Sequence, residues 1–261
     1  MIIEALLIGA FVGIVVGSLG AGGGILSVPI LVYLLGQDPH QATGLSLIIV
    51  GLTAAVSLAT RARGTDVAWR EGSLFALAGL AGTWAGSTLG PLVSASALML
   101  SFCALLGVVA LFMVRSHLSP VSSLPKAPVS QAAPSGVSTL VRVVVLATAT
   151  GFLTGFFGVG GGFAIVPALH LALRYPMKRA SATSLLVMVI TAAFGVVSRS
   201  LAGSFTITAE AGVMVALFTA ASMAGGIVGA RVTTRVPNRV LGLVFAALLV
   251  GVALSTLVAT L

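Results

Sequence analysis

Charge is scarce in this sequence. Only 7% of its 261 residues are charged, whereas an average soluble domain has about a quarter. Hydrophobic residues make up 58% of the chain, and the mean hydropathy is +1.20. These values exclude an ordinary soluble domain and predict an all-α polytopic membrane protein.

Cysteine, histidine and acidic residues are scarce too. The single cysteine, Cys103, cannot form an intrachain disulfide, and we interpret it as a small core residue. The three histidines are dispersed, and no Asp or Glu lies deep within a hydrophobic segment. Catalysis needs a nucleophile, an acid–base pair or a metal cluster, so the sequence predicts no enzyme, no cofactor and no metal site. It also gives no support to a carboxylate proton relay, and the coupling ion is unknown.

Basic residues are the exception to this scarcity. The chain has 13 Lys and Arg residues against 5 Asp and Glu, a formal net charge of +8. In a soluble protein such an excess would suggest a nucleic-acid partner. In a membrane protein it is the Lys/Arg enrichment of cytoplasmic loops, so we expect the lipid bilayer as a partner and no nucleic acid.

Hydrophobic segments form two runs of five. A Pro- and Ser-rich stretch separates the runs and has the composition of a flexible linker. We predict a first transmembrane repeat at residues 1–114, a linker at 115–139 and a second transmembrane repeat at 140–261. The expected segments are 2–16, 25–36, 42–60, 72–90 and 95–114, followed by 140–154, 163–173, 180–198, 207–230 and 239–260.

Two glycine-rich stretches interrupt these runs, GSLGAGGGILSVP at residues 17–29 and GFFGVGGGFAIVP at residues 155–167. An offset of 138 residues superposes their glycines and their Val-Pro ends, and it also aligns Ser46 with Ser184. We interpret the chain as an internal duplication. Because each repeat has an odd number of segments, the second enters the membrane from the opposite side, which predicts two inverted-topology repeats.

The placement of the basic residues supports inversion. Twelve of the thirteen fall on the face that carries the linker, and only Arg199 falls on the other. The positive-inside rule then places the linker in the cytoplasm and both termini outside, on the periplasmic or extracellular side. Since they lie near segment ends on the outer face, Arg199, Asp38 and Glu210 are expected to be solvated.

The segment after each glycine-rich break is too short to cross a membrane. A full crossing needs about 20 apolar residues, so these segments are expected to be half-helices that begin at Ile25 and Phe163. Irregular backbone at membrane depth is tolerated only where protein buries it or where it lines a polar cavity. We therefore expect the two breaks to meet near the midplane. Full crossings and re-entrant hairpins both remain open.

The direction of the half-helices predicts the ligand. Each helix N-terminus points free N–H groups and roughly half a positive charge into its break, which favours an anion. The sequence thus predicts a small-anion site made of backbone amides that needs no buried cation. Close helix packing is the alternative explanation of glycine-rich sequence, and we prefer it for Gly82, Gly86 and Gly90. Packing does not require three glycines in a row.

Side chains near the breaks complete the candidate site. Hydroxyls cluster where the third segment of each repeat starts, close enough for one helical turn to direct several at one point; bonds to their own backbone are the alternative. His170 stands on an apolar face and would bind an anion or carry a proton, with a structural role as the alternative. The candidate substrate-binding residues are Gly20, Gly22, Gly23, Gly24, Thr43, Ser46, Gly158, Gly160, Gly161, Gly162, His170, Ser181, Thr183 and Ser184.

The duplicated GxGGG…VP motif, each copy followed by an A-(T/S)-(G/A)-x-S-L stretch, resembles the sulfite exporter TauE/SafE family of membrane transporters. The resemblance implies a secondary transporter of small sulfur-containing oxyanions, sulfite or organosulfonates, working by alternating access in a bacterial inner membrane. A passive anion channel with the same backbone site is the alternative. Leu45 stands where the second half has Thr183, so we expect tighter contacts at the second break, backed by Thr183 and Ser184. Transport direction and oligomeric state, including a homo-oligomer, stay open.

Overall fold

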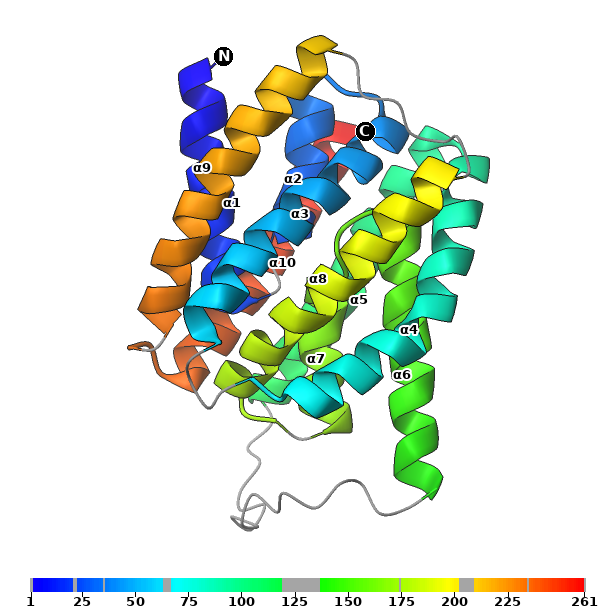
Figure 1. Cartoon of the computed structure of the whole chain (residues 1–261), viewed down its shortest axis with the longest axis vertical. Helices are drawn as coiled ribbons and strands as arrows, with labels where there is room; N and C mark the ends of the chain where they lie inside the picture. The colour runs from blue at the N-terminus through cyan, green and yellow to red at the C-terminus, as the bar shows by residue number, and fades with distance from the viewer. Residues whose placement is uncertain are drawn as a thin grey trace.

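The fold of the chain was obtained as a computed structural model. In the described part of the chain every regular element is a helix, which confirms the all-α prediction (Figure 1). The described residues are 2–20, 23–34, 36–62, 67–118, 137–173, 175–201, 209–233 and 235–260.

Long helices make up most of the described residues. They are α1 (Ile2–Leu19), α3 (Pro39–Arg61), α4 (Trp69–Leu89), α5 (Ala95–Leu118), α6 (Val137–Phe157), α8 (Met177–Leu201), α9 (Ala209–Thr233) and α10 (Asn238–Thr260). Short helices follow the glycine-rich breaks. These are α2 (Gly23–Pro29), which continues as a π-helix at Ile30–Leu34, and α7 (Gly162–Ala172).

The helix surfaces are those of a multi-pass membrane protein. Large apolar side chains such as Leu77, Trp84 and Leu254 are exposed, which suits a surface in contact with lipid tails rather than water. Among the described residues, four helical stretches are long and apolar enough to cross a membrane. They are Pro39–Arg61, Met177–Leu201, Val215–Thr233 and Asn238–Thr256.

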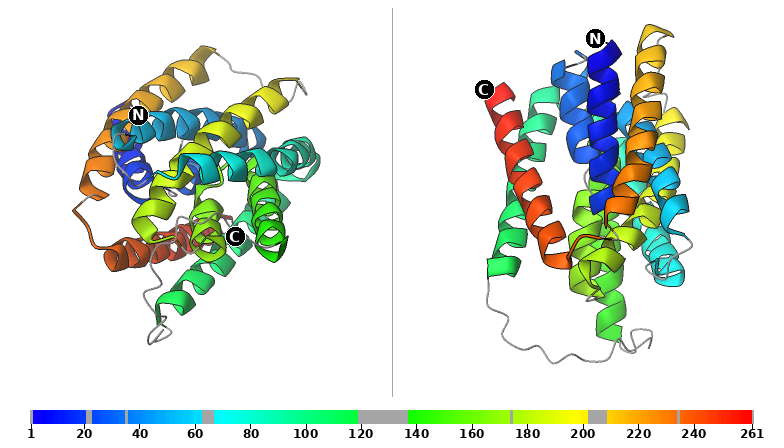
Figure 2. Two further views of the ribbon diagram at one scale, coloured as in Figure 1. Left: turned by 60° about the horizontal axis from the view of Figure 1, so that its bottom comes forward. Right: turned by 90° about the vertical axis from the view of Figure 1, so that its left-hand side faces the viewer.

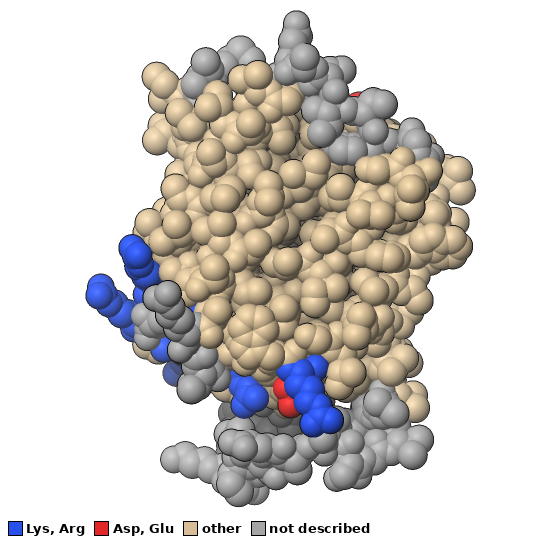
Figure 3. All heavy atoms as spheres, in the orientation of Figure 1, with Lys and Arg blue, Asp and Glu red and all other residues tan. Residues whose placement is uncertain are grey.

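The two ends of the molecule differ. The start of α1 and the end of α10 lie at one end, whereas α5 ends and α6 begins at the other (Figures 1 and 2). On the face seen in Figure 3, Lys and Arg side chains gather at this second end, where α4 and α10 begin and α9 ends. We call it the basic end and the other the terminal end. Exposed Arg70, Arg231 and Arg239 belong to those helix ends.

The helices on either side extend into the stretch predicted as the linker, residues 115–139. α5 continues to Leu118 and α6 already begins at Val137. Residues 119–136 lie outside the described residues.

Helices from one half of the chain pair with helices from the other. α3 packs against α8, α1 lies along α9, α4 lies along α6, and α5 lies along α10. Glycines allow the close approaches, since a Cβ on Gly17 would overlap the carbonyl oxygen of Gly226. Added Cβ atoms at Gly82, Gly86 and Gly90 would likewise crowd backbone atoms of α6, which confirms that these three serve helix packing.

Each short helix turns back on the long helix before it. α2 returns toward the end at which α1 begins, and α7 returns toward the end at which α6 begins (Figures 1 and 2). The 11 residues of α7 span about 16 Å at 1.5 Å per residue, which is too short for a hydrocarbon core of about 30 Å. Both α1–α2 and α6–α7 therefore form hairpins.

The start of α3 is set by its capping residues. Asp38 accepts hydrogen bonds from the backbone N–H groups of His40 at 2.9 Å and Gln41 at 3.4 Å, as an N-cap side chain does, and Pro39 stands in the first turn. Asp38 is exposed, as expected. The side chain of Glu210 lies outside the described part of the chain.

Candidate functional site

The two glycine-rich breaks touch inside the bundle. Gly24, in the first turn of α2, lies so close to Val159 of the second break that a Cβ on Gly24 would overlap the Val159 carbonyl oxygen. Both residues are buried. Gly23 opens α2, and Gly22 lies outside the described residues. The starts of α2 and α7 are thus brought together, as the sequence predicts.

Backbone geometry explains why the breaks are made of glycine. Gly20, Gly158, Gly160 and Gly161 each have φ of +65°, the left-handed region that residues with a Cβ adopt at a cost. Gly161 is the N-cap of α7, which starts at Gly162. The chain therefore reverses within a few buried residues, and the N-terminus of α7 lies in the interior.

Hydroxyl-bearing residues contact each break from the opposite half of the chain. Ser184 Oγ donates a 2.6 Å hydrogen bond to the carbonyl oxygen of Gly20, and a Cβ added to Gly20 would lie 2.7 Å from Ser181 Oγ. At the second break, Gly158 lies directly against the backbone of Thr43. α8 thus supplies the first break and α3 the second, because each of these helices begins where the hairpin of the other half turns.

The expectation that Ser184 and Thr183 back the second break is therefore wrong. Ser184 contacts the first break. Thr183 Oγ1 accepts a 3.1 Å hydrogen bond from the backbone N–H of Ala68, which is the N-cap residue of α4.

Arg199 lies inside the protein beside the second break. It is 2% exposed. Its Nη1 donates to Thr43 Oγ1 at 2.9 Å, and its Nη2 donates to the carbonyl oxygens of Gly155 at 2.8 Å and Phe156 at 3.4 Å. These carbonyls belong to the last turn of α6, where backbone acceptors lack intrahelical partners and the helix dipole is negative.

Arg61 takes the corresponding position beside the first break. It is 6% exposed, and it donates from Nη1 to Ser181 Oγ at 3.0 Å and from Nη2 to the carbonyl oxygen of Lys178 at 3.1 Å. The prediction of a solvated Arg199 is wrong. The prediction that an anion site here needs no buried cation stays a prediction. Arg199 is buried because it stands at the end of α8 and donates to Thr43 of the first half and to carbonyl oxygens at the end of α6. Arg61 stands at the end of α3 and donates to Ser181 and Lys178 of the second half.

A sequence signal for this pair was present. The offset of 138 residues that aligns the glycine-rich breaks also aligns Arg61 with Arg199 and Thr43 with Ser181. Arg199 bonds to Thr43, and Arg61 bonds to Ser181. The two arginine–hydroxyl pairs are therefore equivalent under the offset. Nearness to a loop predicts that both arginines are solvated. The offset of 138 residues instead predicts that Arg61 and Arg199 occupy equivalent positions in the two halves.

Two buried polar atoms near the second break lack hydrogen-bond partners among the described residues. These are Arg199 Nε and Ser46 Oγ. Ser46 is fully buried and follows Thr43 by three residues, so the two side chains lie on neighbouring positions of one face of α3. An unsatisfied buried hydroxyl costs about 1–3 kcal/mol.

Other candidates lie away from the break contacts. His170 Nδ1 is 2.6 Å from the carbonyl oxygen of Tyr175, and it follows Gly162 by about 12 Å of helix, so the structure does not bring it to the break. Burial raises the pKa of Tyr175, as does the charge of Glu71, while Arg179 lowers it. Gly160 faces apolar Val50.

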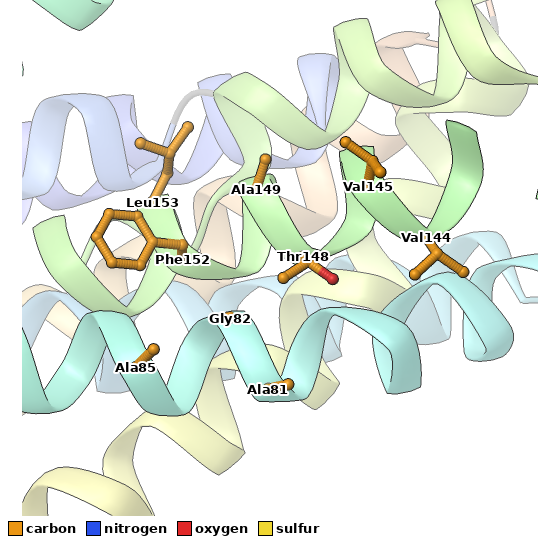
Figure 4. A pocket seen from close by; sticks show the side chains of 9 residues that line it. All are labelled: Ala81, Gly82, Ala85, Val144, Val145, Thr148, Ala149, Phe152 and Leu153. Atoms are coloured by element: carbon orange, nitrogen blue, oxygen red, sulfur yellow. The ribbon is translucent and has the colours of Figure 1, made fainter. Parts of the chain in front are cut away.

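The described surface also carries an apolar groove between α4 and α6 (Figure 4). Its volume is about 660 Å³, and Thr148 provides its single hydroxyl, which donates to the carbonyl oxygen of Ala78 at 3.3 Å. None of the lining residues belongs to a break. The groove therefore offers nothing to an anion and suits a hydrocarbon chain.

The fold and the site together define a polytopic membrane protein with an interior of broken helices, buried hydroxyls and buried arginines, which is the build of a membrane transporter. The sulfite exporter TauE/SafE family matches residues 5–256. The chain belongs to this family. Family membership assigns it to transporters rather than enzymes.

Curated relatives agree with this assignment. A probable membrane transporter protein of Xylella fastidiosa is 37% identical over 193 residues, covering 72% of this chain and 71% of the relative. The probable membrane transporter protein YunE of Bacillus subtilis is 31% identical over 217 residues, covering 75% and 77%. A probable membrane transporter protein of Methanocaldococcus jannaschii is 28% identical over 200 residues, covering 74% and 70%. No solved structure matches the chain.

Proposed function

We propose that this protein is a secondary transporter that moves a small sulfur-containing oxyanion, sulfite or an organosulfonate, across a bacterial inner membrane by alternating access. The observation that carries the proposal is the contact between the two breaks at Gly24 and Val159, deep in the bundle. There the N-terminus of α7 presents amide donors and a partial positive charge to the interior. The name of the family supplies the sulfur oxyanion.

The proposed substrate site consists of the breaks and the hydroxyls that line them. On the terminal-end side it comprises Gly158, Gly160, Gly161, Gly162, Thr43 and Ser46; on the basic-end side it comprises Gly20, Gly23, Gly24, Ser181 and Ser184. Neutral donors of this kind bind an anion without a competing fixed charge at the midplane. His170, Thr183 and Gly22 are kept as weaker candidates.

We also propose that the two halves are inverted-topology repeats of about five segments, at 1–114 and 140–261. Matched contacts support this. Thr43 lies against Gly158 as Ser181 lies against Gly20, and the arginines bond to the same two hydroxyls. Rocking of one repeat against the other would then expose the site to either side in turn.

The gathering of Lys and Arg at one end supports a cytoplasmic basic end (Figure 3). In that orientation both termini are periplasmic, the linker is cytoplasmic, and the protein is multi-pass.

Counterflow in proteoliposomes tests the transport proposal. Vesicles loaded with unlabelled sulfite should accumulate labelled sulfite transiently above its equilibrium level, because a carrier exchanges substrate across the membrane. A passive channel using the same site gives rapid equilibration without the transient. If neither sulfite nor sulfonate moves faster than in empty vesicles, the proposed substrate is wrong.

A further inference from the structure

We propose that Arg61 and Arg199 are the cationic ligands of the transported oxyanion, Arg199 on the terminal-end side of the breaks and Arg61 on the basic-end side. The inference rests on the proposed function, since it names the charged groups that the same site uses. It adds a guanidinium from each half to a site otherwise made of backbone amides and hydroxyls.

The surroundings of Arg199 point to an anion. All three of its acceptors, on Thr43, Gly155 and Phe156, are uncharged oxygens. Within the described part of the chain no carboxylate balances its charge, although the side chain is only 2% exposed. A buried cation without a counter-ion is costly, and within membrane segments such residues mark ion and substrate paths. An oxyanion in the adjoining break would supply the missing negative charge.

Unused hydrogen-bond donors remain on Arg199 and on α3, one turn from its partner Thr43. Arg199 Nε and Ser46 Oγ are both buried and have no hydrogen-bond partner among the described residues. Ser46 lies one helical turn from Thr43, to which Arg199 is bonded. An oxyanion with several oxygens can accept from a guanidinium edge and a hydroxyl together.

Arg61 lies far from Arg199 along the length of α3. Thr43, the partner of Arg199, and Arg61 stand 18 residues apart on α3, which is about 27 Å of helix. The two guanidinium groups thus lie near opposite ends of a crossing of about 30 Å, with the breaks between them. One site cannot use both at once, so each arginine would serve the anion when its own side is open.

The hydrogen-bond partners of the two arginines show how an anion could displace them. In the structure each guanidinium bonds across the α3–α8 contact to a hydroxyl, Arg199 to Thr43 and Arg61 to Ser181. Each also bonds to a backbone carbonyl, Arg61 to that of Lys178 on α8 and Arg199 to that of Gly155 on α6. Hydrogen bonds from a guanidinium to a charged oxygen are stronger than those to neutral oxygens. A sulfite or sulfonate oxygen can therefore replace the hydroxyl when the two helices separate on that side, and the hydroxyl re-forms the bond when the anion leaves.

Binding to the purified full-length chain tests Arg199 directly. The affinity for sodium sulfite would be measured by thermal shift at constant ionic strength in the wild type, Arg199→Gln, Arg199→Lys and the exposed control Arg239→Gln. We expect at least a tenfold weaker affinity in Arg199→Gln, an intermediate loss in Arg199→Lys because the charge is kept without the fork, and no change in Arg239→Gln. An affinity within twofold of wild type in folded Arg199→Gln overturns the role of Arg199.

Ser46→Ala keeps the test valid where an arginine variant fails to fold. It removes a hydroxyl that has no hydrogen-bond partner in the described part of the chain, so the protein without sulfite should melt at the same temperature or higher. Its affinity for sulfite should nevertheless fall roughly threefold or more. A melting temperature that drops while the affinity stays at the wild-type value would mean that Ser46 is structural and that no anion reaches the Arg199 side.

Sidedness separates ligands from structural residues. In proteoliposomes of known orientation, Arg199→Gln should raise the KM for sulfite presented at the terminal end and Arg61→Gln the KM at the basic end, each by at least tenfold. Equal changes at both faces, or a change in kcat alone, overturn the inference while leaving transport in place. If the folded wild type neither binds nor transports any sulfur oxyanion, the proposed function fails and this inference fails with it.

Discussion

Arg199 and Thr43 are 156 positions apart in the sequence, yet Arg199 Nη1 donates a 2.9 Å hydrogen bond to Thr43 Oγ1 in the buried core. The bond joins the end of α8 to the start of α3. Arg61 and Ser181 repeat the relationship at the other end of the same helix pair, at 3.0 Å. The two halves of the chain are therefore held together at both ends of their central contact by charge-assisted hydrogen bonds.

Thr43→Val should destabilise the protein. The substitution keeps the shape of the side chain but removes the oxygen that accepts from Arg199, and a hydrogen bond to a charged group contributes about 1.5–3 kcal/mol. We expect a lower melting temperature in detergent, followed by the fluorescence of Trp69 and Trp84. Thr60→Val is the matched control, since Thr60 Oγ1 donates only to the Val56 carbonyl within its own helix. Equal melting of the two variants would show that the Arg199 bond adds no stability.

Gly158→Ala should be destabilising for a different reason. Gly158 has φ of +65° and lies directly against the backbone of Thr43, so a methyl group adds backbone strain of about 1–3 kcal/mol and a steric overlap. Gly107→Ala, where no atom lies within 4 Å of the added Cβ, should instead stabilise α5 by up to about 1 kcal/mol. Chemical denaturation in mixed micelles measures both, and a Gly158→Ala protein as stable as wild type contradicts the conformation of the break.

The starts of the two short helices could be predicted from sequence, because a local pattern of residues determines them. The half-helix expected from Phe163 begins at Gly162 and the one expected from Ile25 begins at Gly23, because a run of glycines followed by apolar residues ends one helix and starts another whatever surrounds it. The predicted contact between the breaks followed from the duplication and is seen at Gly24 and Val159.

The partners of the breaks were not predictable in this way. Ser184 contacts Gly20, and Thr43 contacts Gly158, because the hydroxyl-bearing helices cross between halves, and an amino-acid pattern within one half carries no information about that crossing. Arg199 was misplaced because nearness to a segment end predicts solvation on average. Its burial depends on carbonyls of α6 that lie more than 40 positions away in sequence, 44 for Gly155.

The orientation in the membrane can be tested with the chain's own cysteine content. Cys103 is buried, so a membrane-impermeant thiol reagent should label the wild-type protein weakly in intact cells. Ser96→Cys, exposed at the start of α5 on the terminal end, should be labelled from outside, and Arg239→Cys, exposed at the basic end, only after permeabilisation. The reverse pattern would place the basic end outside.

A disulfide between α4 and α8 distinguishes a rocking transporter from a fixed channel. Ser87 Oγ and Ser198 Oγ lie 2.6 Å apart in the buried core, so the double variant Ser87→Cys, Ser198→Cys in a Cys103→Ala background has its sulfur atoms within bonding reach. α4 belongs to the first predicted repeat and α8 to the second, and a covalent link prevents them from moving against each other. Oxidation should therefore stop sulfite counterflow, and reduction should restore it.

Binding gives the accompanying readout for this variant. The oxidised protein should still shift its melting temperature with sulfite, because the site on the accessible side needs no rocking to bind, while each single-cysteine variant should transport equally well with and without oxidant. Counterflow at the wild-type rate in a protein whose disulfide is verified by mass would mean that α4 and α8 do not separate during transport. Flux that continues without counterflow would favour the passive channel, because a pore of fixed structure conducts whether or not its two halves are linked.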